Sequence, residues 1–243
     1  MKKFIAMLIV NLLTLIRVIG VFCIVPAFIN HGGLTAAGIS AFCYLTDLID
    51  GVLARKLKVA SFFGSAFDGI ADKLFSVANF VILFTITKFA IIPILCEFAI
   101  LIIQALKFQK NCNIQSSMMG KVKTWVVAFT VVLLYFISDI EKITFLSYDF
   151  ISYVISINPN TLYGILFAPL VLFEILTLIS YFKNFDKCEV NDISKIDIKL
   201  KKPKNFKDRW DNFCTLWLNY DFYMKYKDSA GLKTIRRQIK NNR

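Results

Sequence analysis

The stretch DLIDGVLARKLKVASFFGSAFDGIAD, residues 47–72, places four aspartates inside sequence that is otherwise strongly apolar. Asp47 and Asp50 are three residues apart and Asp68 and Asp72 are four apart, so each pair shares a face if its segment is helical. Two such helices facing each other would bring four carboxylates together. Clustered carboxylates repel one another unless cations neutralise them, and ligand sets made only of oxygen suit Mg²⁺ or Mn²⁺ better than Zn²⁺. The stretch therefore predicts a site for two divalent ions.

The rest of the chain is dominated by long apolar runs. Of its 243 residues 57% are hydrophobic, and the mean hydropathy is +0.60, which is far above the usage of ordinary globular proteins. Six runs come close to the roughly 20 residues that a helix needs to cross a bilayer: residues 5–28, 34–54, 66–87, 89–106, 124–140 and 161–182. The mixed stretch 143–160 is predicted to be an interfacial loop. We therefore predict an all-α, polytopic membrane protein with six transmembrane helices.

Basic residues in the short connections predict the orientation, because Lys and Arg accumulate on the cytoplasmic side. One side carries only Lys88 and Lys142, whereas the other carries Lys2, Lys3, Arg55, Lys56, Lys58, Lys107, Lys110, Lys121, Lys123 and the tail. Both termini are then cytoplasmic, and the aspartates lie at the cytoplasmic ends of the second and third helices. We predict an integral, multi-pass protein of the cytoplasmic (inner) membrane with its active site on the cytoplasmic side.

Two basic residues, Arg17 and Lys73, fall inside predicted spans, where a charge is costly enough to suggest a function. Asn11, Thr14 and Arg17 recur every three residues, so they project from related faces of the first helix. We expect them to line the same polar cavity as the aspartates. For Arg17 the alternative is extension of the side chain to the membrane surface. For Lys73, which follows Asp72, the alternative is simple charge compensation within the aspartate cluster.

The segment 183–243 forms a basic tail after a predicted membrane domain of residues 1–182. It contains 16 basic and 8 acidic residues and so carries +8 of the net charge of +12, which favours anionic lipid headgroups over nucleic acid as its partner. Aromatic residues recur along it at spacings of four, three, four and three: Phe206, Trp210, Phe213, Trp217 and Tyr220. This pattern predicts an amphipathic helix in the headgroup layer. Docking on the protein's own helices or on a partner is the alternative.

The remaining residue types of the stretch 47–72 suit phosphate chemistry. Gly51, Ala54 and Gly64 leave open space on the helix faces, so a base or a phosphate can approach the backbone. Arg55 offers a forked donor to phosphate oxygens. Two divalent ions held by carboxylates can clamp the attacking and leaving oxygens of a phosphoryl displacement, and a free carboxylate can accept the proton of an attacking hydroxyl. The sequence thus predicts phosphoryl transfer at the membrane surface.

These residues resemble the CDP-alcohol phosphatidyltransferases, whose signature reads D-x-x-D-G-x-x-A-R, eight residues, G-x-x-x-D-x-x-x-D. Every fixed position is matched, by Asp47, Asp50, Gly51, Ala54, Arg55, Gly64, Asp68 and Asp72. The resemblance implies a six-helix membrane fold over residues 1–182, and replacement of the CMP of a CDP-linked lipid by an acceptor hydroxyl. It implies that the four aspartates bind the metals, with Asp72 also the general base. It further implies that Gly51, Ala54, Arg55 and Gly64 seat the CDP group.

Within that family, three further segments resemble the branch that joins CDP-diacylglycerol to glycerol 3-phosphate. They are the N-x-x-T-x-x-R opening at Asn11, Thr14 and Arg17, the sequence Ala71-Asp72-Lys73, and the G-K-x-K-T segment of residues 120–124. By this resemblance Lys121 and Lys123 would bind the acceptor phosphate, although both could also be solvated loop lysines. The branch usually carries Arg-Glu in its fourth helix, where this chain has Cys96-Glu97.

Other functions fit parts of the pattern. Cardiolipin synthases of the same family share much of these motifs, with phosphatidylglycerol as the acceptor. A divalent-cation transporter would explain acidic residues at membrane depth but would not need glycines and an arginine at fixed offsets. Membrane transferases acting on prenyl diphosphates are a third class, and a catalytically inactive scaffold a fourth. A homodimer is possible.

Overall fold

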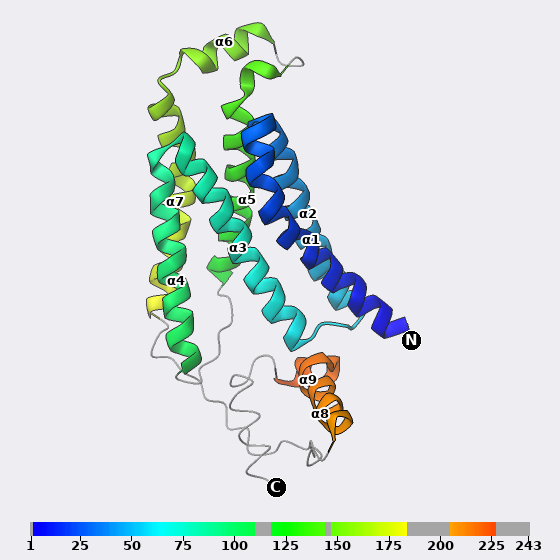
Figure 1. The fold of residues 1–243 in the computed structure, drawn as a ribbon. Coiled ribbons are helices and arrows are strands. Elements are labelled where there is room, and N and C mark those ends of the chain that lie inside the picture. Colours follow the sequence, from blue (N-terminus) through cyan, green and yellow to red (C-terminus); the bar gives the residue numbers. More distant parts are fainter. Residues whose placement is uncertain (1, 110–117, 144–146, 184–204, 227–243) are drawn as a thin grey trace.

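The chain folds into a bundle of long helices, and the computed structural model describes residues 2–109, 118–143, 147–183 and 205–226 (Figure 1). The helices of the bundle are α1 (Lys2–His31), α2 (Gly33–Lys56), α3 (Phe62–Ile86), η1 (Lys88–Ala90), α4 (Ile91–Gln109), α5 (Met118–Ser138), η2 (Ile140–Lys142), α6 (Tyr148–Ser156) and α7 (Pro159–Lys183). The tail forms α8 (Phe206–Phe213), the π-helical turn η3 (Cys214–Leu218) and α9 (Tyr220–Tyr226). The described ranges contain no strand, and the all-α prediction is confirmed.

All six apolar runs form helices, and five of them are long and apolar enough to cross a membrane. These five segments are Ile5–His31, Gly33–Lys56, Phe62–Ile86, Lys88–Leu106 and Pro159–Lys183. The apolar part of α5, Val122–Ser138, is shorter. The chain is therefore a polytopic, all-α membrane protein, while the count of six spans and the cytoplasmic position of the termini stay predictions.

The stretch 143–160 is not a simple loop, because it contains the nine-residue helix α6. Ser147 begins this helix, since its Oγ accepts a hydrogen bond of 3.4 Å from the backbone N–H of Phe150. No residue of α6 is buried, so its aromatic and aliphatic side chains face outward. The sequence predicted a loop here because the stretch is mixed in composition, with Tyr148, Tyr153 and Pro159.

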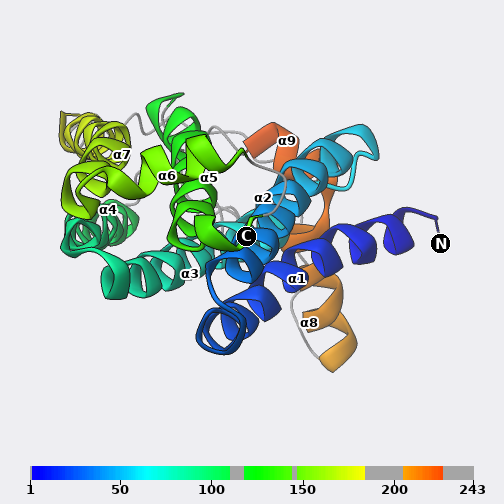
Figure 2. The ribbon, with the colours of Figure 1, turned by 90° about the horizontal axis from the view of Figure 1, so that it is seen from above.

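The core lies where α1, α2, α3, α5 and α7 meet. Viewed from above, α1 and α2 lie on one side of the bundle, α4 and α7 on the other, and α3 and α5 between them (Figure 2). Fully buried aromatic and aliphatic side chains fill the space between these helices: Ile24, Phe75, Phe80, Leu83, Val131, Leu134, Tyr135, Phe167 and Leu170. This packing holds α2 and α3 side by side with α1.

A single residue, Gly32, joins α1 to α2, and its backbone adopts φ +86°, a conformation that other residues rarely adopt. A Cβ at this position would collide with the carboxylate of Asp139, which accepts a hydrogen bond of 3.3 Å from the backbone N–H of Leu34. We expect Gly32→Ala to lower the free energy of unfolding by about 1–3 kcal/mol, through backbone strain and displacement of Asp139. Thermal unfolding of the detergent-solubilised protein measures the change.

Gly38→Ala is the matched control for that substitution. Gly38 lies within α2, and a Cβ there would meet nothing within 4 Å. Alanine is the better helix former, so this variant should unfold at the same or a slightly higher temperature. Equal destabilisation by both substitutions would contradict the special role of Gly32.

Candidate active site

Arg17 lies at the centre of the aspartate cluster. Its fully buried guanidinium contacts carboxylates from both helices of the signature stretch. Its Nη2 lies 2.7 Å from Asp47 Oδ1 and 3.0 Å from Asp50 Oδ2, both on α2. Its Nη1 lies 2.9 Å from Asp68 Oδ1 and also contacts Asp72 Oδ1, both on α3. The structure therefore brings together the two carboxylate pairs that the spacing predicted, and Arg17 points at them rather than at the membrane surface.

The carboxylates suit a divalent cation. Asp47, Asp50 and Asp68 each offer an oxygen, and these oxygens lie within 4.8 Å of one another. The guanidinium of Arg17 carries a single positive charge and faces four aspartates. The cluster therefore keeps a net negative charge that a bound cation can neutralise. All the donors are carboxylate oxygens, the ligands that Mg²⁺ and Mn²⁺ prefer. Asp47, Asp50 and Asp68 therefore fit a divalent cation, while the second ion and the role of Asp72 as a ligand stay predictions.

The cluster opens on the side of α3. The side chains of Asp68 and Asp72 are 38% and 37% exposed, whereas that of Asp50 is only 4% exposed. Asp50 is further held by Thr14, whose Oγ1 donates to its Oδ2 at 3.3 Å. A substrate can thus reach Asp68 and Asp72, while Asp50 is fixed within the bundle.

The predicted polar face of α1 lies against this cluster. Thr14 and Arg17 contact the aspartates directly, and Asn11 lies further toward the start of α1. The Oδ1 of Asn11 is 3.4 Å from the position that a Cβ on Gly64 would occupy. Asn11 therefore faces the first turn of α3, where only a small residue fits comfortably.

The other signature residues differ in the space around them. A Cβ at Gly51 would meet only the guanidinium of Arg55, at 3.9 Å, and the Arg55 side chain is exposed. Ala54 lies half-buried on the same helix. Gly64 lies in the first turn of α3, where its N–H donates to Ser61 Oγ at 3.1 Å. Gly51 therefore leaves room for a phosphate or a base beside the exposed Arg55. At Gly64 the open space that the sequence predicted is absent, because a Cβ there would lie 3.2 Å from Ser61 Oγ.

A second buried charge cluster lies beside the first. Lys73 Nζ lies 2.9 Å from Glu97 Oε2, and Lys123 Nζ lies 2.5 Å from Glu97 Oε1 and 3.3 Å from Glu174 Oε2. Lys73 follows Asp72 on α3, so the two clusters are adjacent along that helix. Lys73 thus pairs with Glu97 rather than with the aspartates. The side chain of Lys121 lies outside the described residues.

Glu174 and Thr177 were missed by the sequence reasoning, and Glu97 was noted only beside Cys96, which replaces the arginine of a family pattern. Both Glu174 and Thr177 are fully buried, and within the described part of the chain Glu174 Oε1 and Thr177 Oγ1 have no hydrogen-bond partner. The sequence did contain a signal for Glu174, which lies in the middle of an apolar run. Placing an acidic residue within the membrane costs as much free energy as placing a basic one there.

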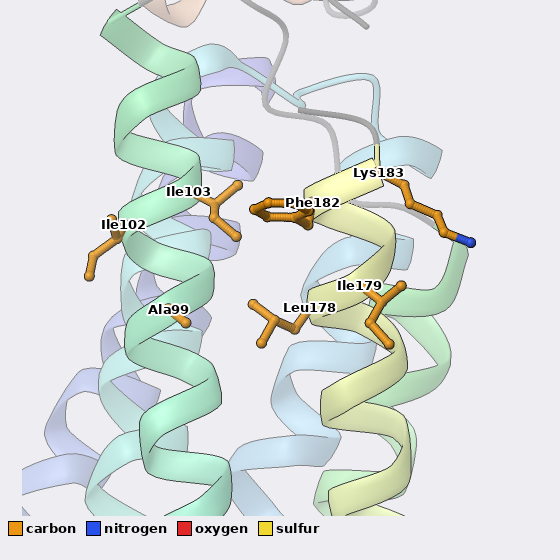
Figure 3. A pocket seen from close by; sticks show the side chains of 7 residues that line it. All are labelled: Ala99, Ile102, Ile103, Leu178, Ile179, Phe182 and Lys183. Carbon is orange, nitrogen blue, oxygen red and sulfur yellow. The ribbon is translucent and has the colours of Figure 1, made fainter. Parts of the chain in front are cut away.

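An apolar groove lies between α4 and α7 (Figure 3). It has a volume of about 580 Å³ and is lined by the isoleucine, leucine and phenylalanine side chains labelled in Figure 3, with Lys183 at its end. Among the described residues that line the groove, Lys183 carries the only charge. The groove therefore suits an aliphatic chain and has no group for phosphoryl chemistry.

Similarity to known proteins covers the part of the chain that carries the four aspartates. The model of the family described as CDP-alcohol phosphatidyltransferase matches residues 7–157. A curated relative, the CDP-diacylglycerol–glycerol-3-phosphate 3-phosphatidyltransferase of Pseudomonas fluorescens, is 37% identical over 80 residues. That alignment covers 30% of this chain and 39% of the relative, so the chain matches well under half of the relative's length. The tail lies outside both the family match and the aspartate cluster.

Proposed function

The chain belongs to the CDP-alcohol phosphatidyltransferase family, and from this we propose that it transfers the phosphatidyl group of CDP-diacylglycerol to glycerol 3-phosphate, releasing CMP. The product would be phosphatidylglycerophosphate, a precursor of anionic phospholipids. The observation that carries the proposal is the convergence of Asp47, Asp50, Asp68 and Asp72 around Arg17. The name of the curated relative supports the choice of acceptor.

The four aspartates would hold the divalent metal ions that this family uses. Bound there, Mg²⁺ or Mn²⁺ would neutralise the pyrophosphate and the charge that develops on it. Arg17, on α1, contacts the same four carboxylates, so it fixes their positions before the substrate binds. Arg55, exposed beside the open space at Gly51, would bind the CDP phosphates through its forked donors.

Asp72 is the proposed general base. It is partly exposed and lies on the open side of the cluster, so an acceptor hydroxyl can reach it. As the hydroxyl oxygen bonds to the phosphorus that carries the diacylglycerol, its proton passes to Asp72. The bond from that phosphorus to the bridging oxygen breaks, and CMP leaves with both bonding electrons. The proton then returns to solvent.

The acceptor phosphate would bind beside Lys73 and Lys123. Each ammonium group has three N–H donors, and its described carboxylate contacts are one for Lys73 and two for Lys123. Glu97 holds both lysines and so sets the distance between them. A location in the cytoplasmic membrane, with both termini in the cytoplasm, would let soluble glycerol 3-phosphate and the membrane-held CDP-lipid reach the same site.

Cardiolipin synthesis is the second candidate, and the groove between α4 and α7 favours it. That groove begins at Ala99 and Leu178, close to Glu97 and Glu174 on the same two helices, and it could hold an acyl chain of a lipid acceptor. A cation transporter fits less well, because transport does not require Gly51, Ala54, Arg55 and Gly64 at their fixed offsets.

An acceptor panel tests the proposal. Purified protein in lipid nanodiscs would be incubated with CDP-diacylglycerol, Mg²⁺ or Mn²⁺, and one of glycerol 3-phosphate, phosphatidylglycerol, serine or inositol phosphate. We expect CMP and phosphatidylglycerophosphate, identified by mass, only with glycerol 3-phosphate. Product from phosphatidylglycerol alone would reject the acceptor and keep the reaction class. Cation uptake into proteoliposomes without CMP would reject both.

Replacing Lys123 tests its role at the acceptor. Loss of one charge-assisted hydrogen bond costs about 1.5–3 kcal/mol, so Lys123→Gln should raise the KM for glycerol 3-phosphate by about 10- to 100-fold. The KM for CDP-diacylglycerol should change little. Steady-state kinetics with each substrate varied in turn measures both constants.

The control for Lys123→Gln is the double variant Lys123→Gln/Glu174→Gln. The single variant leaves Glu97 and Glu174 with one ammonium group fewer, whereas the double variant removes one charge of each sign and restores the balance. If Lys123 binds the acceptor, the high KM persists in the double variant. Recovery of the wild-type KM would mean that Lys123 serves only to balance buried charge.

A further inference from the structure

The tail segment 206–226 packs on the membrane domain at the end where α3 begins. Figure 1 shows α9 beside the first turn of α3, and η3 contacts the same helix. The family match stops at residue 157, and the proposed reaction uses no residue of the tail. The position of the segment next to α3 therefore needs an explanation of its own.

An aromatic cluster makes this contact. The ring of Phe62 meets the ring of Phe222 at 5.8 Å between centroids, with 64° between the planes. It also meets the ring of Tyr223 at 5.2 Å and 80°. Both arrangements are the edge-to-face geometry that aromatic pairs prefer. Phe222 is only 3% exposed, so its ring is packed within the contact and not merely at its edge.

The local structure of the tail directs Phe222 toward Phe62. The predicted amphipathic helix is present but broken: α8 and η3 carry the stacked rings of Trp210, Phe213 and Trp217, and the chain then turns at Asn219. The Oδ1 of Asn219 accepts from the N–H groups of Asp221, at 2.9 Å, and Phe222, at 3.2 Å, and so begins α9. The break turns α9 out of line with α8.

The two parts of the tail have different environments. Phe206 is 81% exposed and Trp210 is 54% exposed, so α8 can still contact lipid headgroups. Leu216 is 5% exposed and Phe222 is 3% exposed. The second half of the segment therefore docks on the protein's own helices, which was the alternative to a position in the headgroup layer.

The first turn of α3 is thereby held from two sides. Phe62 is the first residue of α3, and Ser61 caps the helix by accepting from Gly64 N–H. On the other side Asn11 of α1 lies against Gly64. Asp68 and Asp72 follow one and two turns along the same helix, so a shift of this turn moves them relative to α2. Displacements of about 1 Å at reacting groups can cost about a hundredfold in rate.

We propose that α9 is a positioning element of the active site, in which Phe222 and Tyr223 act through Phe62 to fix the first turn of α3. This inference rests on the proposed function, because the fixed turn carries Gly64, assigned to the CDP group, and leads to Asp68, assigned to the metal. Neither ring belongs to a residue that we assign to substrate binding. The tail is then required for transfer in addition to any contact that it makes with lipid.

A matched pair of substitutions in the full-length protein tests this. Phe222→Ala removes the buried ring, and Phe206→Ala makes the same chemical change at an exposed position of the same segment. We expect Phe222→Ala to raise hydrogen exchange at the Gly64 and Ser65 amides about tenfold and to lower kcat/KM for CDP-diacylglycerol by a similar factor. Phe206→Ala should leave both within about twofold of the wild type. Both are measured in nanodiscs containing anionic lipid.

Two further variants separate positioning from loss of fold. Phe222→Leu keeps most of the apolar volume without the ring and should give a smaller change in both measurements. Phe62→Ala/Phe222→Ala should be no worse than the more severe single variant, because both changes remove the same contact.

Two results would overturn the proposal. One is unchanged exchange and unchanged kcat/KM in Phe222→Ala. The other is an equal loss in Phe206→Ala, which would assign the tail to membrane attachment alone. If the wild-type protein released no CMP with any acceptor, the proposed function would fail, and the exchange measurement alone would decide whether α9 fixes α3.

Discussion

Asp72→Asn should lower the rate of CMP release by about 10²- to 10⁴-fold while the protein stays folded, because a general base contributes about that much to a reaction. The amide keeps the shape of the carboxylate, and its oxygen can still accept a hydrogen bond from Arg17. It cannot take up the proton of the acceptor hydroxyl at neutral pH. The measurement is CMP release from CDP-diacylglycerol under saturating acceptor, alongside thermal unfolding of the same preparation.

The control for Asp72→Asn is Asp149→Asn, the same change at an exposed position on α6. It should leave both the rate and the unfolding temperature unaltered. A titration with Mg²⁺ separates the two roles assigned to Asp72. If high Mg²⁺ restores most of the lost rate, Asp72 acts as a metal ligand, and its assignment as the base is wrong.

Arg17→Gln should destabilise the protein by about 3–5 kcal/mol in the presence of EDTA, because removing one partner of a buried ion pair leaves the other partners uncompensated. Here the loss leaves four converging carboxylates without their shared guanidinium. Addition of Mg²⁺ should then raise the unfolding temperature of Arg17→Gln more than that of the wild type, since the ion supplies the missing positive charge.

Arg55→Gln is the matched control for Arg17→Gln. Arg55 is exposed, so the same substitution should change the free energy of unfolding by no more than about 0.5 kcal/mol in EDTA. It should instead weaken CDP-diacylglycerol binding. Equal unfolding temperatures for Arg17→Gln and the wild type in EDTA would show that Arg17 is not the counter-ion that holds α2 and α3 together.

The aspartate cluster was predictable because its geometry is local. Spacings of three and four residues place Asp47 with Asp50 and Asp68 with Asp72 on any helix, whatever the rest of the fold does. The periodic Asn11, Thr14 and Arg17 predicted a polar face on the first helix in the same way. That Arg17 reaches all four aspartates depends on how α1 packs on α2 and α3, which no local pattern contains.

The cluster around Lys123 shows where local patterns stop. Its members come from α3, α4, α5 and α7, and the pairs are separated by 24, 26 and 51 positions along the chain. Hydropathy averaged over a window also hides one carboxylate among twenty apolar residues. Glu174 was missed for that reason, and the family resemblance did not reveal it because the matched motifs end before α7.

The tail was only partly predictable. Aromatic spacings of four, three, four and three fit one uninterrupted helix, and the sequence shows no glycine or proline at the break. The turn at Asn219 and the burial of Phe222 on Phe62 are tertiary effects that override the local pattern. Helix α6 was missed because nine residues form too few turns to show a clear helical period.

The one-residue joint at Gly32 bears on how the protein enters the bilayer. With no loop between them, α1 and α2 form a hairpin, and the charges of Arg17 on one helix and Asp47 and Asp50 on the other meet within it. A lone α1 would carry an unpaired guanidinium into lipid, at a cost that the paired hairpin avoids. We expect α1 and α2 to integrate as one unit during synthesis. Glycosylation mapping of nascent chains would show it, because Asp47→Ala/Asp50→Ala should then impair integration of α1.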